Sequence, residues 1–308
     1  MRVAVVIVTY NSAPDLPALL GSIPESDEHH QLEVVVSDSG SSDDSLALAS
    51  SLRADVTTVD MGANRGYAAG INAAWAAADS PEAMLLLNPD LTLDAGALEP
   101  WLRALDADGG VVAPRIRNLD GELEPSLRRR PSAWRALVEA VIGGRLAGRL
   151  GLGELVAGAT VYDQPSSAPW VSGAAMAVTA ACMNDVGPWE ERFFLYSEET
   201  DFCLRAGERG HSVSYSPDAG VVHRGGEFTA SVPLYSLLTW NRVRLIRAHG
   251  GAVHAAAMRV AVSVGELVRS FAGSNAGVHR AALGVLWSRD RRQLVLPPET
   301  DLTWAGAR

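Results

Sequence analysis

The sequence lacks several features that define common classes of protein. Its only two cysteines, Cys182 and Cys203, do not have the spacing of metal ligands, so we expect a reduced, cytosolic chain. No Gly-x-Gly-x-x-Gly motif follows the first expected strand, and no Walker loop is present, which weakens dinucleotide-binding and ATP P-loop interpretations. No stretch of 18 apolar residues is free of charge, and charged side chains interrupt the best one, residues 252–268. We therefore expect no membrane span.

The chain also lacks lysine, and all 26 of its basic residues are arginines. Its formal net charge of −10 argues against non-specific binding of nucleic acid. The charge is uneven: from Asn241 onward ten arginines face four acidic residues, a net +6, so the preceding part carries −16. Such a basic segment favours an anionic surface or ligand. The alternative is that these arginines lie on solvated helix faces.

Hydrophobic patterning predicts an α/β fold with a mainly parallel sheet, because strand-like and helix-like segments alternate. The expected strands are Val3–Val8, Leu32–Ser37, Val56–Val59, Ala83–Leu87 and Trp170–Val178, and the expected helices are Pro14–Ile23, Asp43–Leu52 and Tyr67–Ala78. Residues 125–158 have a looser pattern, typical of a mobile excursion. Val213–Tyr215 and Val221–His223 favour a short strand pair. From Tyr235 onward the pattern is mostly helical, so we expect an α/β domain at 1–234 and a helical subdomain at 235–308.

Polar clusters follow three of the expected strands, at Thr9–Asn11, Asp38–Asp43 and Asn88–Asp90. Open α/β sheets bind ligands at the carboxyl ends of their strands, so these clusters should share one edge. Asp38 has two interpretations: it accepts a hydrogen bond from a pyrimidine N3–H, or it caps the following helix. Asp90 is either a ligand for a hard divalent cation or part of an ordinary Asn-Pro-Asp turn. A lone histidine such as His223 is more often structural.

The segment from Phe193 to Gly210 is the most informative stretch of the chain. Aromatic residues lead into Glu198, Glu199 and Asp201, and a helical pattern follows. The first turn of a helix tolerates such crowded acids, because its free N–H groups and dipole favour negative charge. Ser197 is a plausible N-cap. The segment is either a well-capped surface helix or, since the aromatic residues would bury its start, the site of a catalytic base.

Taken together and in order, these segments resemble the family-2 inverting glycosyltransferases of the GT-A fold, in particular the bacterial rhamnosyltransferase branch. The segments that carry the resemblance are residues 6–11, 38–43, 64–72, 86–90, 170–174, 193–210 and 215–223, and it covers about residues 3–250. It implies a GT-A catalytic domain with a mainly parallel sheet flanked by helices, followed by a C-terminal helical extension.

The resemblance also implies a role for particular residues. The residues that would bind the nucleotide-sugar donor are Thr9, Tyr10, Asn11, Asp38, Gly66 and Asn88. The residues that would bind the acceptor are Trp170, Ser172 and Gly173. Asp90 and His223 would hold Mg²⁺ or Mn²⁺, with Asn88 where the family often has a further acid. Glu199 matches the acid that serves as base. That acid is usually Asp, so Asp201 remains the alternative.

These residues favour an inverting glycosyltransferase of cell-wall or polysaccharide synthesis. The family branch suggests L-rhamnose from dTDP-L-rhamnose as the sugar and a polyprenyl-diphosphate-linked saccharide as the acceptor. We expect the enzyme to be cytoplasmic and peripheral at the inner membrane face, with no nucleic acid as partner. Arg242, Arg244, Arg247, Arg259 and Arg269 would lie against the bilayer; the alternatives are that they bind the diphosphate of the lipid-linked acceptor or pack on the catalytic domain. The alternatives are transfer of another sugar to a soluble acceptor, or a catalytically silent scaffold that binds sugar nucleotides.

Overall fold

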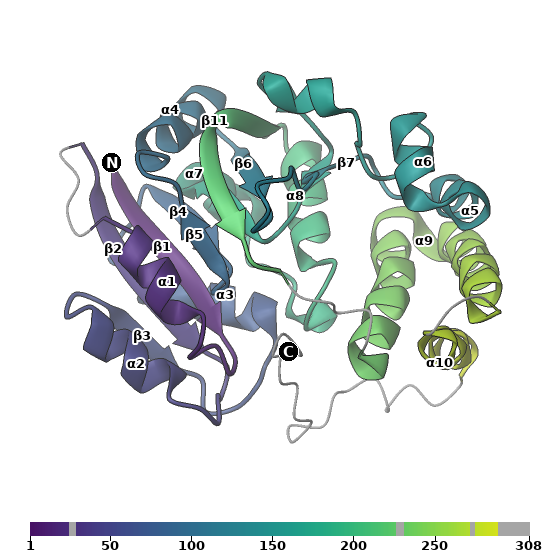
Figure 1. Cartoon of the computed structure of the whole chain (residues 1–308), viewed down its shortest axis with the longest axis horizontal. Helices are drawn as coiled ribbons and strands as arrows, with labels where there is room; N and C mark the ends of the chain where they lie inside the picture. Colours follow the sequence, from purple (N-terminus) through teal and green to yellow (C-terminus); the bar gives the residue numbers. More distant parts are fainter. Residues whose placement is uncertain (25–28, 226–230, 272–274, 289–308) are drawn as a thin grey trace. The chain divides into compact units, whose positions relative to one another are not determined.

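The computed structural model describes residues 1–24, 29–225, 231–271 and 275–288 (Figure 1). The chain forms two compact units. The first contains residues 1–128, 159–194 and 198–225, and the second contains residues 129–158, 195–197 and the described part of 226–308. This division differs from the predicted boundary after residue 234, because residues 129–158 join the C-terminal helices.

The first unit is built on a mixed, mostly parallel sheet with strand order β3-β2-β1-β4-β10-β6-β11-β5 and β8 paired to β11. Its strands are β1 (Arg2–Thr9), β2 (Gln31–Asp38), β3 (Thr57–Asp60), β4 (Ala83–Leu87), β5 (Leu91–Leu93), β6 (Val111–Arg117), β8 (Ser166–Ser167), β10 (Ala175–Thr179) and β11 (Val213–His223). A separate two-stranded sheet pairs β7 (Leu127–Arg128) with β9 (Trp170–Val171). The predicted fold class is confirmed.

Helices cover both faces of the large sheet, which explains why its central strands are continuous apolar runs. They are α1 (Leu16–Ser22), α2 (Ser45–Leu52), α3 (Tyr67–Ala77), α4 (Leu98–Asp108), α7 (Ala180–Val186) and α8 (Glu198–Glu208), with short 3-10 turns η1 (Ala159–Asp163) and η2 (Glu191–Phe193). Leu16 of α1 and Trp101 of α4 pack with Ile7 in one core layer. On the opposite face Gly70 of α3 lies so close to β1 that a Cβ would meet Val8 Cγ1 at 2.5 Å.

The strand directions determine where the polar segments meet. β1, β2, β3 and β4 are parallel, β10 runs antiparallel to both β4 and β6, and β11 is parallel to β6. The carboxyl ends of β1, β2, β4, β6 and β11 therefore lie at one edge of the sheet. Thr9, Asp38 and His223 are the last residues of their strands, and Asn88 follows β4 directly.

Two sequence-based expectations about this unit were wrong. Val213–Tyr215 and Val221–His223 are not paired with each other, because both belong to the single strand β11, whose register along β6 shifts between Ser216 and Gly220. The expected strand Trp170–Val178 is broken into β9 and β10. The intervening turn contains Ser172 and Gly173, and this break places two predicted acceptor residues on a loop.

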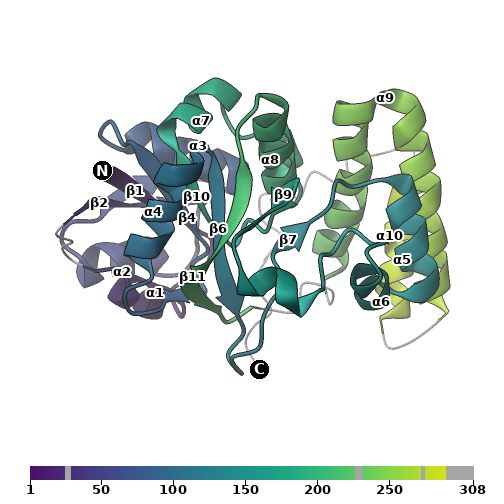
Figure 2. The same ribbon diagram turned by 90° about the horizontal axis from the view of Figure 1, so that it is seen from above.

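The second unit is helical, and consists of α5 (Ala133–Ile142), α6 (Gly144–Arg149), α9 (Val232–Ser270) and α10 (Ala276–Trp287). Residues 133–149 are thus helical rather than the loose excursion that the sequence pattern suggested. α9 is two helices, because Gly251 has non-helical φ/ψ of 79° and −173°. Trp240 before this break and Met258 after it share one core with Ala136 of α5 and Leu286 of α10, and the ribbon shows the two halves side by side (Figures 1 and 2).

Within the described residues, α9 is long and apolar enough to cross a membrane by length and composition, and 33% of its most apolar window is buried. The sequence analysis expected no such segment. The break at Gly251 explains how both halves instead pack within the helical unit. Three arginines of the predicted basic stripe also have protein partners: Arg242 pairs with Glu154 at 3.0 Å, Arg269 with Glu266 at 2.5 Å, and Arg259 lies over the Trp240 ring. They do not form a stripe of solvated charge.

Candidate active site

The first group of predicted site residues forms one hydrogen-bonded cluster at the ends of β1 and β2. Asp38 is buried, and its Oδ1 accepts from Thr9 Oγ1 at 2.7 Å and from Ser41 Oγ at 2.5 Å. Its Oδ2 accepts from the Ser41 N–H at 2.8 Å. The Asn11 N–H donates to Ser41 Oγ, and Asn11 Oδ1 accepts from the Ser42 N–H, both at 2.8 Å. Since a carboxylate offers about four lone-pair positions, Asp38 fixes this loop and retains one acceptor position.

The second group surrounds the start of α3. Gly66 has φ 89° and ψ 170°, and a Cβ there would meet the Phe194 carbonyl oxygen at 2.3 Å. The Tyr67 N–H donates to that same oxygen at 2.7 Å, and the Tyr67 hydroxyl donates to Asn88 Oδ1 at 2.8 Å. Only glycine adopts this backbone readily. The Asn64–Asn72 segment is thereby fixed against both the end of β4 and the aromatic lead-in to α8.

The surroundings of Tyr67 show that several acidic side chains lie near its hydroxyl. Burial raises the pKa of Tyr67 well above its ordinary value, and the charges of Glu198, Asp90 and Glu199 raise it further. These carboxylates come from α8 and from the turn after β4, segments that are more than 100 residues apart in sequence. Tyr67 therefore remains a neutral hydroxyl donor at the centre of an acidic site. The sequence pattern gave no sign of this role.

Asp90 and His223 face each other because of strand register. β5 runs antiparallel to β11 with His223 opposite Leu91, and the Arg224 N–H donates to the Asp90 carbonyl at 3.0 Å. This register places His223 Nε2 3.2 Å from Asp90 Oδ2. Burial lowers the pKa of His223, but hydrogen bonds to Asp90 and Glu124 raise it to about 10. The predicted convergence of Asp90 and His223 is present in the structure.

Three neighbours of this pair were missed by the sequence analysis. Glu124 Oε2 lies 2.9 Å from His223 Nδ1, so it fixes the ring with Nε2 towards Asp90. Asp15, at the start of α1, forms an ion pair with Arg224. Burial is the largest cause that raises the pKa of Asp15, and the charge of Asp90 raises it further. Glu124 follows a hairpin turn after β6, and no local pattern marks it as a partner of a residue 99 positions away.

The acids of α8 have different surroundings. Asp201 is buried, and its Oδ2 accepts from Arg205 Nε at 2.7 Å. Arg205 is held further by the Val186 carbonyl oxygen at 2.9 Å. Glu199 instead lies against the turn between β9 and β10: a Cβ on Gly173 would be 3.0 Å from Glu199 Cβ and 3.7 Å from its carboxyl carbon. Of the two candidate bases, Asp201 is thus held by an ion pair, whereas Glu199 borders the predicted acceptor loop.

Strained backbone conformations occur in the segments that carry the predicted site residues. Among the described residues, five non-glycine residues have positive φ, namely Asn11, Ser80, Phe194, Tyr196 and Ser197. All except Ser80 belong to segments on which the sequence analysis placed the site, and such conformations concentrate at functional sites. Ser197, with φ 76°, does not have the extended backbone usual for an N-cap.

The remaining predicted acceptor residues border the small sheet. Trp170 belongs to β9, and the Arg128 guanidinium carbon lies 5.7 Å from the centroid of its ring. The Ser172 N–H donates to the Ser126 carbonyl at 3.0 Å. Tyr10 is half-buried, and its N–H donates to Ser12 Oγ at 3.2 Å.

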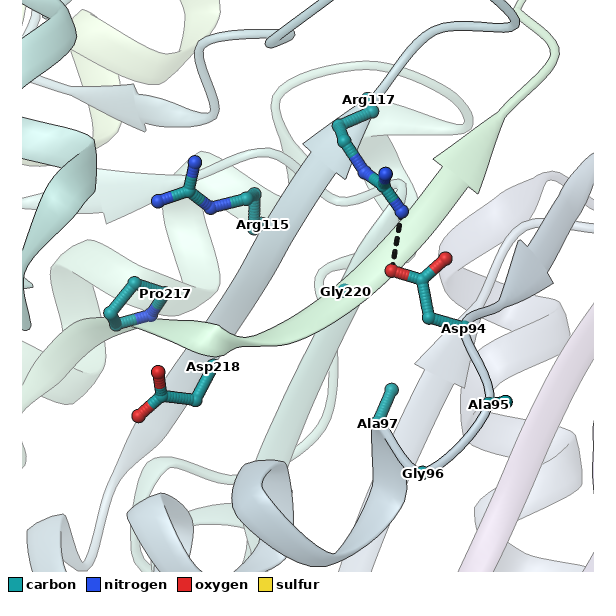
Figure 3. Close-up of a pocket in the computed structure, with 9 residues that line it drawn as sticks. All are labelled: Asp94, Ala95, Gly96, Ala97, Arg115, Arg117, Pro217, Asp218 and Gly220. Atoms are coloured by element: carbon teal, nitrogen blue, oxygen red, sulfur yellow. Dashed lines mark hydrogen bonds and ion pairs between the residues drawn. The ribbon is translucent and has the colours of Figure 1, made fainter. Parts of the chain in front are cut away.

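A polar pocket of about 340 Å³ lies elsewhere in the same unit (Figure 3). It is lined by Asp94, Ala95, Gly96, Ala97, Arg115, Arg117, Pro217, Asp218 and Gly220. Arg117 pairs with Asp94, and Arg115 donates to the Tyr162 carbonyl at 2.5 Å. Two acids balance two arginines, so the pocket has no excess charge to attract an anion, and none of the predicted site residues lines it.

Comparison with known proteins identifies the class to which this fold and site belong. Residues 4–155 match the family described as Glycosyl transferase family 2. The chain is 31% identical over 247 residues to an N-acetylglucosaminyl-diphospho-decaprenol L-rhamnosyltransferase of Mycobacterium tuberculosis, which covers 74% of this chain and 78% of the relative. The chain therefore belongs to glycosyl transferase family 2 and is a glycosyltransferase, which confirms the resemblance.

More distant relatives are found by sequence and by structure. A low-salt glycan biosynthesis hexosyltransferase of Haloferax volcanii is 25% identical over 224 residues, which cover 71% of this chain and 66% of the relative. Among solved structures, a Pyrobaculum calidifontis mannosyltransferase in complex with GDP-Man and Mn²⁺ has TM-score 0.60 and 18% identity, covering 94% of this chain and 88% of its own. S. aureus TarS 1–349 has TM-score 0.52 and 17% identity, covering 94% and 76%. The fold is GT-A.

Proposed function

We propose that the protein transfers L-rhamnose from dTDP-L-rhamnose, with inversion, to a hydroxyl of a polyprenyl-diphosphate-linked saccharide. The observation that carries this proposal is the 31% identity over most of the chain to an enzyme named for L-rhamnosyl transfer to N-acetylglucosaminyl-diphospho-decaprenol. The structure supports the chemistry, because the acidic side chain of Glu199 borders the predicted acceptor loop and an Asp–His pair lies at the carboxyl edge of the sheet.

Donor binding is assigned to the clusters at the ends of β1, β2 and β4. Thr9, Asn11 and Asp38 form a loop that is already ordered by its own hydrogen bonds, which reduces the entropy lost on binding. The remaining acceptor position of Asp38 suits the N3–H of a thymine base. Gly66 and Asn88, joined through Tyr67, are assigned to the sugar–diphosphate part, and Tyr10 to the nucleoside.

A divalent cation fits the Asp90–His223 pair. The donor set is one carboxylate oxygen and one imidazole nitrogen, 3.2 Å apart, with the ring orientation fixed by Glu124. Among the described residues no group of three or more His, Cys, Asp and Glu side chains is arranged to hold a metal, so the donor diphosphate and water would complete the coordination, as Mg²⁺ commonly requires. When bound, the cation would offset the charge that develops on the leaving diphosphate.

Glu199 is assigned as the base. Inversion requires the acceptor hydroxyl to lose its proton as it attacks the anomeric carbon, and a positioned carboxylate contributes about 10²–10⁴-fold to such a step. Glu199 borders Gly173, so an acceptor held by Trp170, Ser172 and Gly173 would have its hydroxyl within reach of this carboxylate. Asp201 is assigned a structural role, since Arg205 holds it.

The proposal is tested with the purified chain and a short-chain lipid diphosphate that carries N-acetylglucosamine. dTDP-L-rhamnose, UDP-glucose, UDP-N-acetylglucosamine and GDP-mannose are supplied separately with Mg²⁺ or Mn²⁺. We expect transfer from dTDP-L-rhamnose alone, and NMR of the product should show the anomeric configuration opposite to that of the donor. Faster transfer from another donor would overturn the sugar assignment, and donor binding without hydrolysis or transfer would favour a scaffold.

An enzyme with a lipid-linked acceptor meets this substrate at a membrane surface. We therefore assign the protein to the inner face of the cell membrane as a peripheral enzyme.

A further inference from the structure

The helix α5 places its large apolar residues on the outside. Exposed fractions are 63% for Trp134, 37% for Leu137, 73% for Val141 and 37% for Ile142. With Val138 they follow the spacing i, i+3, i+4, i+7, i+8, which in most helices marks the face turned to the protein core. We call these five residues the outer face of α5. It contains no charged or hydrogen-bonding group apart from the indole N–H.

The opposite side of α5 explains why the large apolar residues lie on the outside of this helix. Ala136 is buried in the helical core, and Ala133 packs against the same cluster. Ala140 lies where α9 comes close, since a Cβ on Gly265 would be 3.2 Å from Ala140 Cβ. Small residues therefore make the contact with α9, and Glu139 on this side receives the Glu154 N–H at 2.6 Å. The outer face is thus not a packing surface of this unit as described.

Exposed apolar residues continue into α6. Leu146 is 49% exposed and Leu150 is 58% exposed, and Arg145 and Arg149 between and beside them are also exposed. The other large hydrophobic residues of the second unit that are exposed in the described chain are Leu152 and residues of α9, its C-cap and α10, whereas the first unit contributes only Leu52 and Leu119. Monomeric proteins seldom concentrate apolar surface in this way without a partner for it.

The charge of the segment identifies the partner. Residues 129–153 contain five arginines and one acid, Glu139, in a chain of net charge −10. Arg129 and Arg135 donate to backbone carbonyls of the same segment, whereas Arg145 and Arg149 of α6 are exposed. Tryptophan and leucine on one side, with arginines at the border, are typical of helices that lie in the interface of an anionic bilayer. A second copy of the chain would be a poor partner, because a two-fold contact would place these arginines against themselves.

We infer that α5 and α6 form a monotopic membrane-binding surface, with the outer face of α5, Leu146 and Leu150 inserted into the headgroup region of an anionic bilayer. This inference rests on the proposed function and extends it, because the enzyme would meet its lipid-linked acceptor at the membrane to which it is bound. It replaces the arginine stripe of α9 as the predicted membrane contact, because Arg242, Arg259 and Arg269 of that stripe have partners within the protein.

The test is co-sedimentation of the full chain with acceptor-free vesicles of phosphatidylglycerol and phosphatidylcholine. The double variant Leu137→Asp/Val141→Asp should bind at least about tenfold more weakly, since it removes apolar insertion and adds repulsion. The matched double variant Leu52→Asp/Leu119→Asp makes the same charge change on exposed residues of the first unit and should change binding less than about twofold. Arg145→Gln/Arg149→Gln should weaken binding roughly fivefold for each charge removed, and salt should weaken wild-type binding.

Three outcomes would overturn the inference. The first is equal vesicle binding by Leu137→Asp/Val141→Asp and wild type, or no binding by wild type. The second is a dimer in light scattering that this variant dissociates, which would make the face a contact between copies. The third is a large fall in melting temperature for this variant but not for its matched control, which would mean that the chain itself covers the face. Donor hydrolysis is measured on the same samples, so failure of membrane binding leaves the transferase proposal separately testable.

Discussion

At the scale of single residues, the acids of α8 can be separated by what holds them. Glu199→Gln keeps the shape of the side chain and removes its basicity. We expect kcat to fall by about 10²-fold or more, because proton abstraction is lost, while donor affinity stays within about twofold. Steady-state kinetics with a binding titration of dTDP-L-rhamnose measures both. An equal loss of donor affinity would assign Glu199 a structural role instead.

Asp201→Asn should behave differently from Glu199→Gln. Asp201 is buried and bound by Arg205, so loss of its charge leaves the guanidinium without its anionic partner. We expect the free energy of unfolding to fall by roughly 1–3 kcal/mol, with a smaller loss of kcat than for Glu199→Gln. Chemical denaturation and kinetics of both variants decide this. A larger kcat loss in Asp201→Asn, with stability unchanged, would move the base to Asp201.

We expect Glu124 to act through His223 as a positioning residue, since its carboxylate lies 2.9 Å from the ring. A carboxylate on the far nitrogen of a metal-binding histidine orients the ring and raises its basicity, and loss of such a partner typically weakens metal binding about 10- to 100-fold. We expect this for Glu124→Gln in a titration with Mn²⁺ and dTDP followed by electron paramagnetic resonance. Glu122→Gln, on the exposed turn two residues before it, is the control. Unchanged Mn²⁺ affinity in Glu124→Gln would contradict the role.

At the scale of elements, the start of α3 depends on a glycine. Gly66→Ala would adopt φ 89° and ψ 170° and place a Cβ 2.3 Å from the Phe194 carbonyl oxygen. We expect a loss of about 2–5 kcal/mol, from backbone strain and overpacking together. Gly62→Ala has a similar φ of 67° but no atom within 4 Å, so about 1 kcal/mol is expected. Equal losses in denaturant unfolding would mean that contact with Phe194 does not matter.

The sequence predicted the elements whose pattern is local. Val3–Val8 and Ala83–Leu87 are continuous apolar runs because helices cover both faces of the sheet, and such runs are recognised without any partner. The convergence of Thr9, Asp38 and Asn88 also followed, since parallel strands share an edge. These predictions required only strand positions and directions.

What the sequence could not provide depends on contacts between distant segments. β11 is a single strand because β6 pairs with both halves of it across a register shift, and no local signal encodes that pairing. Glu124 reaches His223 only after the turn at 118–122 returns the chain. Residues 133–149 were judged loose because their glycines interrupt the pattern, whereas α9 supplies the close-packed surface that makes Ala136 and Ala140 favourable in a helix.

At the scale of the whole molecule, charge and hydrophobicity are separated between the two units. The acidic residues of the site belong to the first unit, whereas most exposed apolar residues and the arginine-rich segment 129–153 belong to the second. Such separation is consistent with one part that binds a metal–nucleotide pair and another that binds an anionic surface. Substitutions can then abolish either of these two binding functions without disturbing the core of the other unit.

This separation leads to a prediction about stability that links the metal to the donor. A ligand that binds only the folded state stabilises it by RT ln(1 + [L]/Kd), about 2.7 kcal/mol at 100 times Kd, or several degrees in melting temperature. With dTDP present, Mn²⁺ should raise the melting temperature of wild type and of Glu199→Gln alike, because the base is not needed for binding. In Asp90→Ala the Mn²⁺-dependent part should vanish, since one of the two proposed protein ligands is gone, while the shift caused by dTDP alone persists. The measurement is a thermal melt of each variant with dTDP, with Mn²⁺ and with both. A full Mn²⁺-dependent shift in Asp90→Ala would place the cation elsewhere, and a loss of the dTDP shift in Glu199→Gln would show that Glu199 supports the donor site rather than the proton transfer.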